Sequence, residues 1–163
     1  MNYEKLVEEA AVVVGAPASS ELAGAVTKVL ADGFVFYFKA HSFHWNVVGK
    51  DFPQLHGFFG GVYEAVFGNV DRLAEEIRAL DAMAPMNLAT LLSEATVMEN
   101  KSTLDGMGMV AALAADNQKI LSGLLACQKM AEAANQVGLA NFLQDLYDSH
   151  KKFAWQFSAI LKG

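Results

Sequence analysis

Apolar residues recur every three or four positions along most of this chain, the spacing that places them on one face of an α-helix. Short runs rich in glycine, proline and serine interrupt the pattern and mark where one helix ends and the next begins. The run GAPASS, residues 15–20, supplies Ser19 or Ser20 as a helix cap, and Gly138 marks a later break. The predicted helices cover residues 3–14, 21–47, 53–80, 87–95, 104–135 and 140–161.

These helices predict an all-α fold with four long members. The second and third predicted helices are separated by a short turn, as are the last two, so each pair forms a hairpin. The connection between the hairpins, residues 82–102, is long for a bundle and carries the short helix at 87–95. Two hairpins joined in this way form a four-helix bundle with one long crossover. The pentapeptide FVFYF, residues 34–38, could form a strand by itself, but its long helical context favours a helix.

The predicted helix at 53–80 has two distinct faces. One stripe is apolar and is expected to face the core of the subunit: Leu55, Phe59, Val62, Val66, Val70, Leu73, Ile77 and Leu80. A second stripe lies about 100° around the helix and holds His56, Gly60, Tyr63, Phe67, Asp71 and Ala74, with Glu64 and Glu75 at its edge. A face that mixes aromatic, small and metal-binding residue types is not typical of a solvated surface.

Four of these side chains predict a metal site shared by two chains. His44 ends one predicted helix and folds back beside His56, whereas Asp71 lies fifteen residues beyond His56. At ~1.5 Å per residue this separation is roughly 22 Å, so one chain cannot bring both ends to one ion. A second, antiparallel hairpin would bring Asp71 and Glu75 of one chain to the histidines of the other. The spacing therefore predicts a two-fold dimer with two equivalent interface sites.

Simpler interpretations of the same residues exist. The histidines could form hydrogen bonds across a dimer without any metal. Asp71 and Glu75 could be solvated and paired with Arg72 and Arg78, respectively. However, two carboxylates four positions apart on a helix repel each other unless a cation lies between them, and a metal ion supplies that cation.

Composition narrows the class of protein. Of the 163 residues, 18% are charged and 53% are hydrophobic, and we interpret the low charged fraction as surface buried by association. The net charge of −6, with scattered basic residues, does not fit a nucleic-acid-binding surface. A single cysteine, Cys127, excludes an intrachain disulfide. Because no apolar run is long enough to span a membrane and the N-terminus is acidic, we expect one cytoplasmic domain, residues 1–163.

The sequence resembles the Dps mini-ferritins. The resemblance rests on HSFHWNVVG, on His56 twelve positions after His44, on DRLAE, and on the C-terminal segment that contains Trp155. It covers residues 21–161 and implies a ferritin-like four-helix subunit that assembles as a hollow dodecamer. Such a protein oxidises Fe(II) with hydrogen peroxide or oxygen and stores ferric mineral, which protects against oxidative damage. The resemblance implies His44, His56, Asp71 and Glu75 as iron ligands and catalytic residues, with Trp45 nearby and Zn(II) or Mn(II) as possible competitors.

Two departures from the family pattern change these expectations. Four residues after His56 the family supplies a carboxylate, whereas this chain has Gly60. One iron position is then expected from His44, Asp71 and Glu75, and a weaker second one at His56, with Glu64 as a possible but distant substitute. A shell or metal-binding protein that has lost oxidation is the alternative. The termini also lack a lysine-rich tail, so direct DNA binding is not expected, although a DNA-compacting module is a further alternative.

Overall fold

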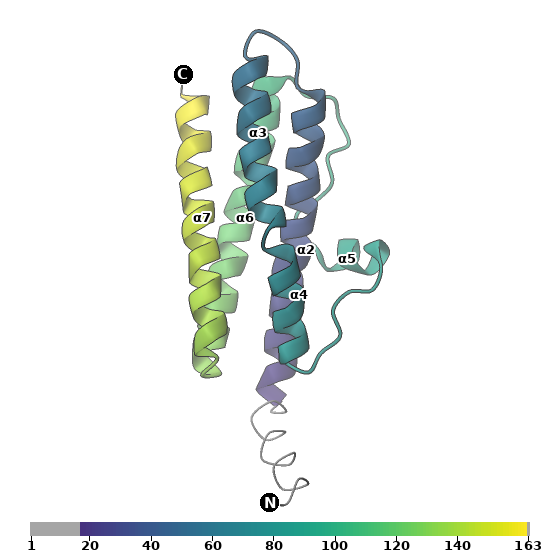
Figure 1. The fold of residues 1–163 in the computed structure, drawn as a ribbon, viewed down its shortest axis with the longest axis vertical. Helices are drawn as coiled ribbons and strands as arrows, with labels where there is room; N and C mark the ends of the chain where they lie inside the picture. The colour runs from purple at the N-terminus through teal and green to yellow at the C-terminus, as the bar shows by residue number, and fades with distance from the viewer. Residues whose placement is uncertain (1–16, 163) are drawn as a thin grey trace, which may run out of the picture.

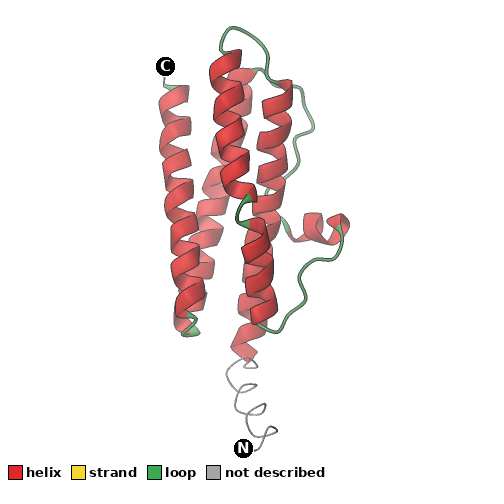
Figure 2. Cartoon of the chain, viewed as in Figure 1, coloured by secondary structure: helices red, strands yellow, loops and turns green. Residues whose placement is uncertain are grey.

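The long helices pack side by side in a bundle, and two shorter helices lie end to end within it (Figure 1). The computed structural model describes residues 17–162, so the predicted helix at 3–14 lies outside the described residues. The helices are α2 (Pro17–Asn46), α3 (Phe52–Phe67), α4 (Val70–Ala79), α5 (Leu88–Glu94), α6 (Gly106–Ala133) and α7 (Val137–Leu161). Residues 17–162 contain helices and loops but no strand (Figure 2).

The order of the helices gives the predicted topology. α2 runs antiparallel to α3 and α4, and α6 runs antiparallel to α7 (Figure 1). Between these pairs the chain crosses from one end of the bundle to the other, carrying α5 at its side. The all-α bundle with one long crossover and a short crossover helix is therefore confirmed. The strand alternative for residues 34–38 is wrong, because these residues lie within α2.

The predicted helix at 53–80 is wrong in one respect, because it is two helices. Gly68 and Asn69 separate α3 from α4. The Asn69 side chain donates a hydrogen bond to the carbonyl oxygen of Ala65 at 2.8 Å, and its backbone N–H donates to Val66 O at 3.2 Å. The side chain thus takes the carbonyl that the backbone N–H would use in a regular helix. Gly68, which precedes Asn69, also favours the break because glycine is a weak helix former.

Two other boundaries differ from their predictions. Within the described residues α2 covers Pro17–Asn46, so Ser19 and Ser20 lie inside the helix and do not precede it. The turn before α7 ends at Gln136, and Gly138 lies within the helix. Asn135 makes this turn because it adopts φ 55°, the left-handed conformation that asparagine tolerates better than most residues.

The core is apolar with a few polar links between helices. Phe36, Phe59 and Phe157 are fully buried at its centre. Every member of the predicted core stripe on α3 and α4 is buried except Val70, which is half-buried. Cys127 of α6 is also buried, and desolvation raises the pKa of its thiol to about 12, so the reactive thiolate is disfavoured.

Polar contacts connect the helices of the bundle to one another and to the crossover. Lys39 of α2 and Asp116 of α6 form a buried ion pair. The buried carboxylate of Asp32 accepts hydrogen bonds from the backbone N–H groups of Thr96 and Val97, at 2.6 and 2.8 Å. Asp32 thereby fixes the end of the crossover against α2. Within residues 17–162, each helix is too short or too polar to cross a bilayer.

Candidate metal centre

His44 and His56 are joined by two reciprocal hydrogen bonds. Nδ1 of His44 lies 2.7 Å from the main-chain oxygen of His56, and Nδ1 of His56 lies 2.8 Å from the main-chain oxygen of His44. A carbonyl oxygen only accepts hydrogen bonds, so each Nδ1 carries the proton. In the neutral rings Nε2 then keeps its lone pair, which is the form in which histidine binds a metal.

The two imidazole rings stack face to face. Their centroids are 3.7 Å apart and their planes differ by 23°. The lone pair of Nε2 lies in the ring plane, and two nearly parallel planes at this separation meet only far from both rings. A single ion therefore cannot lie in line with both lone pairs. If these rings bind metal, each would therefore serve its own ion.

Gly60 lies directly beside these rings. It is buried, and a Cβ atom added at this position would lie 3.4 Å from Nδ1 of His44. Gly57 and Gly61 differ from Gly60, because no described atom lies within 4 Å of a Cβ added at either. At Gly60 the close neighbour is the imidazole of His44, a predicted ligand.

Asp71 and Glu75 are exposed on α4 and are not neutralised by nearby arginines. Arg72 contacts Glu76 at 3.7 Å and lies over the Phe142 ring. Arg78 instead donates to the carbonyl oxygen of Ala82 at 2.8 Å. The alternative in which Arg72 pairs with Asp71 and Arg78 with Glu75 is therefore wrong for the described chain.

The imidazoles and the carboxylates do not meet within one chain. Among residues 17–162, no three or more histidine, cysteine, aspartate or glutamate side chains gather closely enough to hold a metal ion. His44 and His56 lie where α2 meets α3, whereas Asp71 and Glu75 lie beyond the break on α4. Completion of the site by a second chain stays a prediction.

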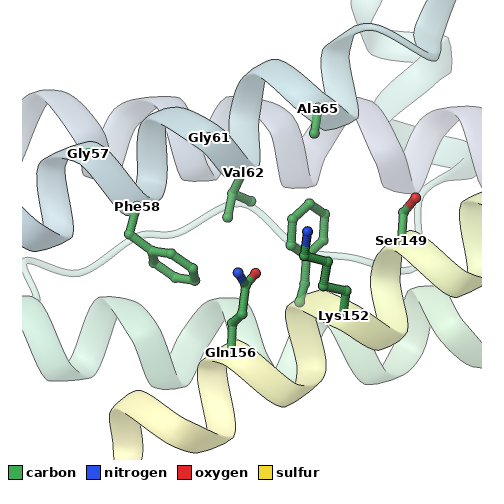
Figure 3. Close-up of a pocket in the computed structure, with 9 residues that line it drawn as sticks. Gly57, Phe58, Gly61, Val62, Ala65, Ser149, Lys152 and Gln156 are labelled. Atoms are coloured by element: carbon green, nitrogen blue, oxygen red, sulfur yellow. The ribbon is translucent and has the colours of Figure 1, made fainter.

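A groove between α3 and α7 lies apart from these residues. It has a volume of about 450 Å³, and Lys152 and Gln156 of α7 face Gly57 and Gly61 of α3 across it (Figure 3). None of the four predicted ligands lines this groove. This groove is therefore not the candidate metal centre.

Aromatic side chains surround the histidines on the same surface. His41 stacks on Tyr63 at 3.9 Å and contacts Trp45 at 4.1 Å between ring centroids. Desolvation, with a smaller contribution from His44, lowers the pKa of His41. Trp45 is 57% exposed and Phe67 is 53% exposed, so this surface is apolar and open in the single chain. Such a patch is typical of an interface between proteins.

Sequence reasoning missed the hydroxyl contact of Tyr63. Its hydroxyl donates to the Glu64 carboxylate at 3.4 Å, and its ring meets the edge of His44 at 5.3 Å between centroids. Desolvation, followed by the charge of Glu64, raises the pKa of the Tyr63 phenol. The position of Tyr63 on the same helical stripe as His56 was the available signal, but its ring contacts with His41 and His44 depend on how α2 packs against α3.

Comparison with known proteins identifies the family of this fold. Residues 24–163 match the family model described as a ferritin-like domain. The chain belongs to the ferritin-like family. A DNA protection during starvation protein from Brevibacillus brevis is 28% identical over 137 residues, which cover 84% of this chain and 92% of that protein.

Solved structures place this ferritin-like chain with the Dps mini-ferritins. A Dps protein from Bacillus brevis superposes with a TM-score of 0.86 at 27% identity, covering 90% of this chain and 98% of that one. A Dps protein from Vibrio cholerae, described as a member of the ferritin-like diiron-carboxylate superfamily, gives a TM-score of 0.84 at 28% identity, covering 88% and 91%. The resemblance drawn from HSFHWNVVG and DRLAE is confirmed at the level of family and fold.

Proposed function

We propose that this ferritin-like protein oxidises Fe(II) and stores the ferric product as mineral inside a hollow dodecamer, protecting its surroundings from iron-driven oxidation. Hydrogen peroxide or oxygen is the oxidant. The observation that carries the proposal is the pair of stacked imidazoles, each with Nδ1 bonded to a carbonyl and Nε2 left for a metal. The Dps relatives and the diiron-carboxylate description of the Vibrio cholerae protein support it.

In this proposal each site uses residues of two chains. His44 and His56 of one chain bind two neighbouring Fe(II) ions, and Asp71 and Glu75 of the partner bring the charge that neutralises them. Mixed nitrogen and oxygen ligands suit Fe(II), and Zn(II) or Mn(II) would compete for the same donors. DNA forms no part of the proposal, because the net charge of −6 per chain opposes binding to phosphate.

Subunit mixing tests the shared site directly. His44→Ala removes an imidazole and keeps the carboxylates, whereas Asp71→Asn does the reverse. We expect each variant alone to oxidise iron at a rate close to background. In a dimer of one chain of each kind, one of the two sites has all its native ligands, so a random equal mixture should recover about a quarter of the wild-type rate.

The matched control places both substitutions in one chain. A mixture of this double variant with the Asp71→Asn variant contains no complete site in any pairing, so it should stay at background. Recovery in the control, or none in the first mixture, would contradict the shared site. Stopped-flow absorbance of ferric iron measures the rates, and gel filtration verifies that every sample is assembled.

Gly60 favours one competing function, a metal-binding shell without oxidation. The position that His56 serves lacks the nearby carboxylate, so its iron is held by fewer charged ligands. A wild-type protein that binds Fe(II) but does not oxidise it, together with a Gly60→Asp variant that does, would favour the competitor. Iron oxidation by the wild type at a rate that depends on His44 favours the ferroxidase.

A further inference from the structure

Tyr63 contacts both a predicted iron ligand, His44, and the carboxylate of Glu64. One face of its ring stacks on His41 at 3.9 Å with an angle of 16° between planes, and its ring also meets His44 at 5.3 Å and 74°. Its hydroxyl donates to Oε1 of Glu64 at 3.4 Å. The phenol therefore touches an imidazole on one side and a proton acceptor on the other.

The two electrons needed to reduce hydrogen peroxide suggest a role for these contacts of Tyr63. A role for Tyr63 in oxidation rests on the proposed ferroxidase function. Reduction of one hydrogen peroxide molecule to two water molecules takes two electrons, and oxidation of one Fe(II) supplies one. With Gly60 in place of a carboxylate, the proposed second iron position beside His56 has one ligand fewer, so we expect one Fe(II) to be bound more tightly than the other. The second electron must then come from another iron or from the protein.

We propose that Tyr63 supplies this second electron and that Glu64 receives the phenolic proton. The O–O bond of hydrogen peroxide breaks, Fe(II) becomes Fe(III), and the Tyr63 phenol becomes a neutral phenoxyl radical. Two protons complete the two water molecules. One is the phenolic proton, held in passing by Glu64, and the other comes from solvent. Atoms and charge balance without a further reductant.

The neighbouring aromatic residues are less well placed for this step. The Tyr37 hydroxyl faces Nδ1 of His41 at 3.4 Å, and its ring lies 6.4 Å from that of Tyr63. Trp45 contacts His41 and Phe38. In the described part of the chain neither Tyr37 nor Trp45 has a ring contact with His44 or a carboxylate partner. Tyr63 combines both features.

A single-turnover experiment tests the proposal. The assembled wild-type protein, loaded without oxygen with one Fe(II) per site, is mixed with one equivalent of hydrogen peroxide and frozen within milliseconds. Electron paramagnetic resonance should show a tyrosyl radical, and ring-deuterated tyrosine should narrow its signal. Tyr63→Phe should abolish this signal, whereas Tyr37→Phe, which removes one hydroxyl from the same aromatic cluster, should keep it.

Two further readouts separate electron transfer from a merely structural effect. Glu64→Gln keeps the shape of the side chain but does not accept the phenolic proton as a carboxylate does, so radical formation should slow several-fold. Tyr63→Phe should release more hydroxyl radical to a spin trap in solution, because the second electron is missing. Circular dichroism and gel filtration verify that each variant is folded and assembled.

The outcomes distinguish this inference from the function on which it rests. A wild-type protein that oxidises iron without a tyrosyl radical, a radical located on Trp45, or an unchanged signal in Tyr63→Phe would overturn the role of Tyr63 and leave the ferroxidase function standing. A wild-type protein that binds Fe(II) but produces no ferric iron with peroxide would overturn both.

Discussion

Asn117 of α6 and His150 of α7 hold the two helices together through a closed pair of hydrogen bonds. Nδ1 of His150 donates to Oδ1 of Asn117 at 2.6 Å, and Nδ2 of Asn117 donates to the main-chain oxygen of His150 at 2.9 Å. Both side chains are buried, and the imidazole also contacts Phe36 and Phe153. This environment gives His150 a structural role.

The burial of His150 predicts a loss of stability in acid. Desolvation lowers its pKa from 6.5 to about 4 in the folded chain. Between these values the unfolded chain binds a proton and the folded chain does not, so the free energy of unfolding falls as the pH falls through this window. The full contribution, present above the unfolded pKa, is about 3 kcal/mol at ~1.4 kcal/mol per pKa unit.

The variant His150→Gln isolates this contribution, because glutamine donates a hydrogen bond but does not titrate. We expect the wild type to lose more stability than the variant between neutral pH and the folded pKa. Denaturant midpoints at one protein concentration, compared across pH, measure the difference. Carboxylates that titrate in the same range affect both proteins equally, so parallel curves would show that His150 is not the cause.

The buried pair of Lys39 and Asp116 predicts two substitutions with unequal costs. Asp116 contacts Lys119 at 3.3 Å as well as Lys39, whereas Lys39 has Asp116 as its one ion-pair partner in the described chain. Asp116→Asn leaves a buried ammonium without a counter-charge and should cost about 3–5 kcal/mol. Lys39→Met leaves the carboxylate paired with Lys119 and should cost clearly less. Urea unfolding of the two variants measures the order, and equal costs would contradict it.

Glycine at the start of α6 predicts a steric effect. A Cβ atom at Gly106 would lie 2.6 Å from Cδ1 of the buried Leu55. Gly106→Ala should therefore destabilise the fold by about 1 kcal/mol through overpacking. Gly123→Ala, in the middle of the same helix with nothing within 4 Å of its added Cβ, should instead stabilise it by about 0.5–1 kcal/mol. Thermal midpoints that shift in the same direction would contradict this reading of the contact.

The sequence was sufficient to predict most of the helices and to name the candidate ligands, because both predictions depend on local spacing. The break at Gly68 and Asn69 was missed because Val66, Val70 and Leu73 continue the helical apolar pattern across it. The Asn69 side chain competes for the Ala65 carbonyl, and the spacing of apolar residues does not reveal this competition. The sequence also could not predict which ring nitrogen of His44 and His56 carries the proton. This depends on hydrogen bonds that form only where α2 packs against α3.

Nδ1 of His44 forms a hydrogen bond and its Nε2 is the proposed metal ligand, so a substitution can remove one role and keep the other. The amide nitrogen of asparagine can take the place of Nδ1, so His44→Asn keeps a donor to the His56 carbonyl but has no group at the position of Nε2. It should lose Fe(II) binding and change stability little. His44→Ala removes both functions and should also lose about 1 kcal/mol, because the hydrogen bond is gone. Anaerobic iron titration and thermal unfolding measure the two effects, and an asparagine variant that binds Fe(II) as tightly as the wild type would show that Nε2 of His44 is not a ligand.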